Sequence, residues 1–235
     1  MPNHVTNILT LSGDAAEVKK AMEAIKYDKV GVGSIDFNKI IPMPPSLNIE
    51  CGSRTEKGLK LYSEFIRDSG LPQTAEKYQK LQEDDPEMWA LGKQTYENVQ
   101  EHGCMGWYDF ALNHWGTKWN SYGYDEDFQP QEDNKIIFQT AWSKPTPVIG
   151  KLSEMFPDLE INHRWADEDL GYNCGEAEYK NGEVIFENIP DFGSKEAYEL
   201  AAEVIGLDLA EEGLVLSEDG SIYEYNEDMD GQQMT

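Results

Sequence analysis

Two kinds of residue in this sequence could do chemistry, and the first is a string of aromatic and polar residues. The string is Trp115-Gly116-Thr117-Lys118-Trp119-Asn120. If it is extended, Trp115 and Trp119 share one face of a strand. With Lys118 and Asn120 beside them, they would form a platform that stacks a base or another planar ring. The alternative is an aromatic face buried under helices, and the shortage of cations in this half of the chain favours it.

The second candidate is a pair of carboxylate runs, Asp125-Glu126-Asp127 and Asp167-Glu168-Asp169. Clustered carboxylates are ligands that hard divalent cations prefer, and they also attract basic groups of a partner. The alternative, which we favour, is that both runs are solvated turns. Four tail residues match the start of a calcium-binding loop: Asn226, Asp228, Asp230 and Gly231. Position 12 of that loop would lie beyond Thr235, so no calcium site is predicted there.

Motifs for other chemistry are missing from the sequence. The histidines and cysteines lack the paired spacing of a zinc site, and there is no nucleophile elbow, phosphate-binding loop or dinucleotide fingerprint. We therefore expect no cofactor or metal and assign no catalytic residue. With 45 acidic residues, a pair of carboxylates carries no information about hydrolysis, which stays open as an alternative.

The charge of the chain limits its partners. Against 45 Asp and Glu stand 19 Lys and Arg, a formal net charge of −26. Nucleic acid and anionic membranes would repel such a chain, so we expect neither as a direct partner and favour a basic protein. Residues 1–117 carry 17 acids and 12 bases, whereas residues 118–235 carry 28 acids and 7 bases. The acidity is therefore concentrated in the second half.

The sequence also predicts a compartment. No stretch approaches the roughly 18 apolar residues of a membrane span, and the first residues do not resemble a secretory signal. The three cysteines, Cys51, Cys104 and Cys174, are odd in number and widely spaced. Because they cannot all pair within one chain, we expect a reducing, cytoplasmic location.

The elements that must position these residues follow from the spacing of apolar side chains. Alternating apolar residues predict a strand over 3–11, and a helix capped near Asp14 should follow it. A second strand is expected over 35–41, so the chain is predicted to open as a βαβ unit. Helices are expected over 56–68, 73–82 and 86–102. The remainder favours strands over 115–124, 136–142 and 159–166, hairpins over 176–186 and 214–225, and helices over 148–156 and 194–205.

Several strings resemble a family of proteins carried by phages and conjugative plasmids, the YubB-like proteins with a ferredoxin-like C-terminal domain. The strings are Pro2–Asn7, Asn113–Asn120, Phe138–Pro145 with its continuation to Pro157, and the hairpin from Gly175 through Tyr179 to Gly182. The resemblance implies a βαββαβ-type antiparallel sheet and an accessory gene of a mobile element. It provides no catalytic residue to transfer. "Ferredoxin-like" here names a topology, because an iron–sulfur cluster needs four suitably spaced cysteines.

Together these observations predict an α+β protein, a ferredoxin-like antiparallel sheet with an inserted helical block and an acidic C-terminal extension. The expected segments are a βαβ start at 1–45, a helical insertion at 46–103, a ferredoxin-like region at 104–192 and an acidic helix-hairpin extension at 193–235.

Two functions of different classes compete. The first is an accessory protein that binds a basic host protein, in one version as a nucleic-acid mimic whose carboxylates are spaced like phosphates. The second is a metal-dependent hydrolase or nuclease-like enzyme that uses clustered carboxylates. An RNA-binding sheet is a third possibility, although no RNP-like aromatic motif is present. Against all of these stands the simpler interpretation that the acidity serves only solubility.

Overall fold

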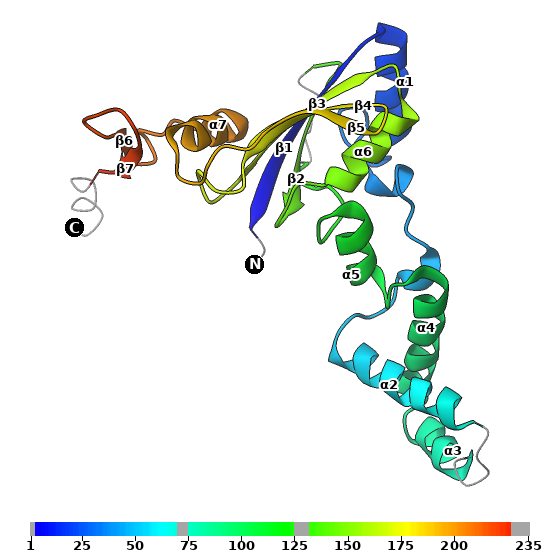
Figure 1. Ribbon diagram of the computed structural model, residues 1–235. Helices are drawn as coiled ribbons and strands as arrows, with labels where there is room; N and C mark the ends of the chain where they lie inside the picture. The colour runs from blue at the N-terminus through cyan, green and yellow to red at the C-terminus, as the bar shows by residue number, and fades with distance from the viewer. Residues whose placement is uncertain (1–2, 70–74, 125–131, 227–235) are drawn as a thin grey trace. The chain divides into compact units, whose positions relative to one another are not determined.

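The computed structural model describes residues 3–69, 75–124 and 132–226. Their contacts divide the chain into two compact units, residues 1–41 with 115–235 and residues 42–114. The first unit contains the sheets, and the second is helical (Figure 1).

The main sheet of the first unit is antiparallel, with strand order β2-β1-β3-β4-β5 in the described residues. The strands are β1 (His4–Ser12), β2 (Lys135–Ala141), β3 (Glu160–Asp167), β4 (Gly175–Lys180) and β5 (Glu183–Asn188). In β1, alternate residues are buried, as the sequence predicted: Val5, Asn7, Leu9 and Leu11. Since β2 and β3 are both antiparallel to β1, they are parallel to each other, and they flank β1 on its two sides in the sheet.

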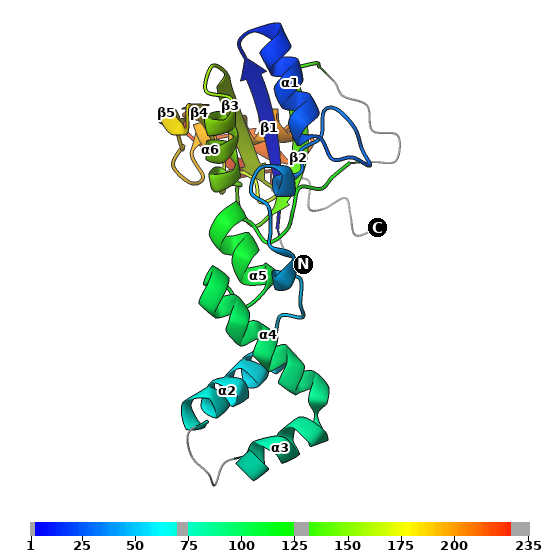
Figure 2. The same ribbon diagram turned by 90° about the vertical axis from the view of Figure 1, so that its right-hand side faces the viewer.

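Helices cover both faces of this sheet. α1 (Ala15–Ile25) and α6 (Thr146–Met155) lie on one side, and α7 (Lys195–Ile205) lies on the other, as Figures 1 and 2 show. α6 connects β2 to β3 across the intervening β1, which is the split βαβ arrangement of ferredoxin-like folds. The predicted caps are confirmed, because Asp14 accepts backbone amides at the start of α1 and Ser194 does so for α7.

The strand expected over 35–41 is wrong, because the segment forms the 3₁₀ turn η1 (Phe37–Lys39). Asp36 caps this turn, and Phe37 is fully buried with its amide donating to Oδ1 of Asn120 at 2.8 Å. Side chains and local backbone bonds of the turn, rather than a neighbouring strand, therefore satisfy this part of the backbone. The chain opens with a βα unit rather than βαβ.

The hairpin between β4 and β5 is confirmed in detail. Asn181 and Gly182 both have positive φ, 49° and 83°, as a type I′ turn requires. The acidic end of the chain adds a second hairpin, formed by β6 (Leu214–Leu216) and β7 (Tyr223–Tyr225). In the described part of the chain, no helix combines the length and apolar character needed to cross a membrane.

The helical unit is built around the contact of two helices. Its elements are η2 (Pro45–Leu47), α2 (Ser53–Asp68), α3 (Ala75–Asp84), α4 (Pro86–His102), α5 (Trp107–Phe110) and the π-helical turn η3 (Ala111–Trp115). The three predicted helices are confirmed with small shifts of their ends. α2 and α4 approach at Gly58 and Gly92, and Tyr62, Phe65 and Trp89 gather beside them with ring centroids 5.1 to 5.6 Å apart.

Candidate binding site at one end of the sheet

Trp115, the first residue of the aromatic string, belongs to the core. Its side chain is buried, its Nε1 donates to the carbonyl of Ile41 at 3.0 Å, and its ring meets Phe37 edge to face. The extended strand expected over 115–124 is wrong, because the described segment forms bends with a single bridge, Tyr122 to Gln139. Trp115 and Trp119 therefore do not share a strand face.

The next residues fasten the segment to the end of β2. Gly116 has φ of 75°, and a Cβ there would lie 2.9 Å from Cδ of Pro147. The buried Thr117 hydroxyl donates to the carbonyl of Ala141 at 2.7 Å and accepts from the amide of the same residue at 3.1 Å. Ser143 Oγ donates to the carbonyl of Gly116 at 2.5 Å. These contacts fix the position of the backbone directly before Lys118.

Lys118 lies between two exposed indoles. Its Nζ is 4.6 Å from the ring centroid of Trp119 and 4.8 Å from that of Trp142. Trp119 is 37% exposed and Trp142 is 41% exposed. We call these three residues the tryptophan platform. Cation–π contacts at exposed sites contribute about 0.5–1 kcal/mol each, so the ammonium favours this arrangement of the two rings.

Trp142 has an unusual backbone. Its φ is 74°, in the left-handed region that a bulky residue rarely adopts. Its amide donates to the carbonyl of Asn3 at 2.9 Å, and its own carbonyl accepts from Nδ2 of Asn173 at 3.2 Å. Three segments of the chain thus fix the conformation that presents this indole.

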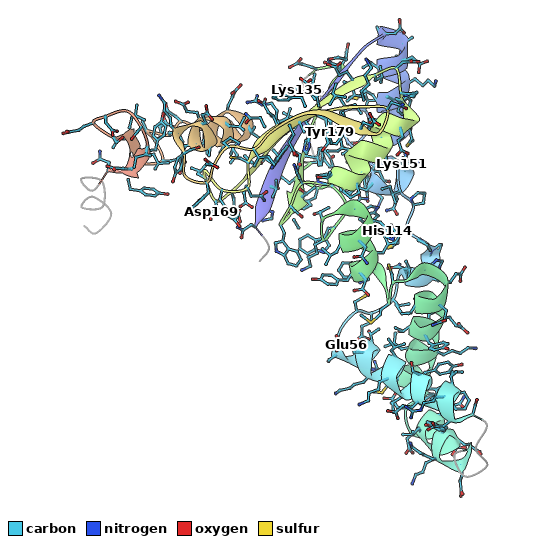
Figure 3. The ribbon with its side chains drawn as sticks, in the orientation of Figure 1. Glu56, His114, Lys135, Lys151, Asp169 and Tyr179 are labelled. Atoms are coloured by element: carbon cyan, nitrogen blue, oxygen red, sulfur yellow. The ribbon has the colours of Figure 1, made fainter. Side chains whose placement is uncertain are left out.

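The carboxylate of Asp167 connects those segments. It is buried, where Oδ1 accepts from Asn3 Nδ2 at 3.1 Å and from the amide of Asp169 at 3.0 Å. Its Oδ2 accepts from Asn173 Nδ2 at 3.1 Å. The interpretation of this run as a solvated turn is therefore wrong for Asp167, although Glu168 and Asp169 are exposed. Figure 3 labels Asp169, on the loop that follows β3.

Asn120 is tied to internal backbone. Its Oδ1 accepts from the amides of Phe37 at 2.8 Å and Ser121 at 2.9 Å, and its Nδ2 donates to Asp36 at 2.7 Å. These contacts connect the segment after the platform to η1. They give Asn120 a structural role.

A tyrosine and a histidine extend the site, and the sequence did not single them out. Tyr122 meets Trp119 edge to face at 6.1 Å, and its hydroxyl lies 2.7 Å from Nδ1 of His4. Burial, with the charge of Glu168 adding to it, raises the pKa of Tyr122 to about 12, so its hydroxyl stays protonated at neutral pH. His4 is the first residue of β1, which places it at the same end of the sheet.

Glu168 lies near this site, since its backbone amide donates to the carbonyl of His4 at 2.9 Å. Asp125, Glu126 and Asp127 lie outside the described residues, as does most of the calcium-like tail. Within the described ranges, no group of three His, Cys, Asp or Glu side chains is placed to hold a metal ion. Four carboxylates do line one shallow pocket beside α7, together with Leu207, Leu209 and Tyr223. They are Glu199, Asp208, Glu211 and Glu212.

Comparison with known proteins agrees with the topology. Residues 118–208 match a family model described as the ferredoxin-like domain in Api92-like protein. The chain is therefore an α+β protein with a ferredoxin-like domain. A crystal structure of the protein api92 from Yersinia pseudotuberculosis is similar at 11% identity and a TM-score of 0.41, covering 81% of this chain and 98% of that one. No curated protein matches the chain.

Proposed function

We propose that this protein acts by binding a basic protein partner, with the tryptophan platform as the central contact. The observation that carries the proposal is the exposed indole of Trp142 on a left-handed backbone. Such a conformation costs on the order of 1–3 kcal/mol and persists only where its surroundings enforce it, most often at functional sites. The buried Asp167 network enforces it here.

The residue types of the platform suit a protein contact. Tryptophan is enriched among the few residues that dominate binding energy at interfaces, because its large apolar surface becomes desolvated there. Trp119 and Trp142 lie together and are held by Lys118, so a partner would bury rings whose positions are already fixed.

The charge of the protein favours a basic partner over nucleic acid. The first unit contains residues 118–235, which carry 28 acids and 7 bases. Carboxylates are frequent on α7 and the hairpin after it: Glu196, Glu199, Glu203, Asp208, Glu211, Glu212, Glu218, Asp219 and Glu224. Attraction between this surface and a basic protein would speed their encounter and weaken as salt is added.

A specific version of the proposal is mimicry, in which these carboxylates occupy the nucleic-acid groove of a host protein and inhibit it. The sequence resemblance to YubB-like proteins supports this version, because it suggests an accessory protein of a phage or plasmid acting in the cytoplasm. For the competing idea of a metal-dependent hydrolase, the described residues offer no favouring observation.

The test starts with capture from a bacterial lysate at low salt and continues with the purified partner. Replacing Trp119 by Ala or Trp142 by Gly should weaken binding about tenfold or more, while Ile66→Ala, an exposed change on α2, should leave it unchanged. Trp142→Gly is chosen because glycine accepts the left-handed backbone, so the variant remains folded.

Two results would contradict the proposal. One is a partner whose affinity is the same for all three variants and the wild type. The other is binding that does not weaken between 50 and 500 mM NaCl, because attraction between exposed charges is screened at high salt.

A further inference from the structure

β5 is the edge of the main sheet and is exposed along its whole length. Among the described strands it pairs with β4 alone, and each of its six residues is exposed. Three consecutive residues are large and apolar: Val184 at 49%, Ile185 at 51% and Phe186 at 46% exposure. An open strand edge carries unpaired backbone groups that can bond to another strand. This strand therefore has both the backbone and the side chains to accept one.

The apolar residues of β5 occur on both faces of the sheet. Val184 pairs with Tyr179, whose side chain is buried on the side of α6, and Phe186 pairs with Glu178 on the other side. The register shift between these pairs leaves Ile185 as the extra residue of a bulge. An added strand would find apolar side chains above and below it, which a strand serving only as an edge does not need.

Charges around β5 indicate what kind of strand would fit. Glu183 and Glu187 lie at either end of the apolar run, and Glu176 and Glu178 lie on the neighbouring β4. Two ammonium groups lie near them, because Lys144 pairs with Glu187 at 2.9 Å and Lys180 of β4 lies opposite Glu183. Carboxylates therefore outnumber ammonium groups beside this edge. Opposite charges across a strand pair are favourable and like charges directly opposite are unfavourable.

The same charges argue against a second copy of this chain. If two β5 strands paired antiparallel about Ile185, Glu183 of each would lie opposite Glu187 of the other. Shifting the pairing by one residue places Glu187 opposite Val184. In neither register does a carboxylate meet a cation.

We propose that β5 accepts an extended segment of a basic protein as a sixth strand of the sheet, with Lys or Arg residues meeting the carboxylates and β-branched residues covering the apolar run. The inference stands on β5 alone and does not require the tryptophan platform, so each can fail without the other. Binding of this kind combines backbone hydrogen bonds with side-chain selection.

The probe is a short synthetic peptide in which Lys and Arg alternate with Val, compared with a peptide that has Glu in place of each basic residue. The basic peptide should slow hydrogen exchange of the β5 amides that do not bond to β4. Ile185→Lys, which adds a repelling charge at an exposed position, should weaken binding about tenfold. Val215→Lys, a matched change at an exposed position of β6, should alter it less than about twofold.

Spectra of the two variants would first establish that both keep the wild-type fold. The proposal is overturned if the β5 amides gain no protection, if the acidic peptide binds equally well, or if Ile185→Lys binds like the wild type. It is also overturned if the wild-type chain forms a dimer that Ile185→Lys dissociates, because a second copy would then be the occupant. An N-methylated basic peptide that fails to bind would support pairing through the backbone.

Discussion

His163 lies in the middle of β3 with its ring fully buried. Asn7 uses its Nδ2 as a donor to Val5 and Thr140, so its Oδ1 accepts from Nε2 of His163 at 3.0 Å. Among the described residues, Nδ1 of this ring has no hydrogen-bond partner. Burial, and then the nearby charge of Lys144, lower the pKa of His163 to about 3.

This buried histidine makes stability depend on pH. In the unfolded chain the ring takes up a proton near pH 6.5, whereas the folded protein excludes it until about pH 3. Stability is therefore lost as pH falls below 6.5, by about 2 kcal/mol between pH 7 and pH 5 from this group alone. Urea unfolding at the two pH values measures the loss.

The matched variant is His163→Gln, whose amide can still donate to Asn7 but does not titrate. Its free energy of unfolding should fall less between pH 7 and pH 5, by about 2 kcal/mol less than that of the wild type. An equal fall in both proteins would show that His163 is not the group responsible.

At the residue scale, some of the residues singled out in the sequence lie together in the structure. Lys118 and Trp119 were candidates and lie together on the platform, and Asp167 lies in the network behind it. Trp142 was not singled out, because no residue pattern marks a tryptophan that adopts a positive φ. Trp115 and Trp119 differ in burial although they are four residues apart, because bends replace the expected strand.

At the scale of elements, the α2–α4 contact depends on two glycines. A Cβ built on Gly92 would lie 2.3 Å from the carbonyl oxygen of Gly58, closer than any packing allows. The neighbouring atom is backbone and cannot rotate away. The helices must therefore separate if Gly92 gains a side chain.

Gly92→Ala should consequently destabilise the protein by about 1–3 kcal/mol, the usual cost of overpacking. Gly150→Ala is the control, because Gly150 lies within α6 and no neighbouring atom is within 4 Å of the position that an added methyl group would take. That change should stabilise the protein by up to about 1 kcal/mol, since alanine favours a helix more than glycine does. Thermal unfolding of both variants measures whether each change in stability is a loss or a gain. A change in the same direction for both variants would contradict the prediction.

Elements with strong local patterns were predictable, and those held by distant side chains were not. Buried residues alternate along β1, and α4 begins at Pro86 and ends before Gly103. Asn181 and Gly182 form the turn of the β4–β5 hairpin. Each of these elements therefore follows from its own residues. Segments 35–41 and 115–124 have the apolar and aromatic content of strands but do not form them. Part of their backbone is satisfied by contacts between the two segments, such as Asn120 to Phe37, and these contacts cross about 80 residues of chain.

At the scale of the whole molecule, the net charge of −26 opposes folding. Compaction brings carboxylates closer than they are in the unfolded chain, and the repulsion is screened by salt. The ion pairs that the structure contains are mostly exposed, so they offset little of this repulsion.

We therefore expect the midpoint of thermal unfolding to rise by a few degrees between 20 and 300 mM NaCl. A double variant, Glu211→Lys with Glu212→Lys, should raise the midpoint at low salt and lose most of that advantage at high salt. Calorimetry checks both effects. A midpoint that does not depend on salt would mean that self-repulsion contributes nothing to stability.

The register of β1 has a consequence for the order of events during synthesis. Thr10 pairs with Lys135 and Val5 pairs with Asp167, so among the described strands the first one has no partner until more than 120 further residues have been made. The helical unit at 42–114 makes its main contacts within itself and can form earlier. On the ribosome, the apolar face of β1 therefore stays exposed until β2 and β3 have been synthesised. During that interval a chaperone would protect it from aggregation.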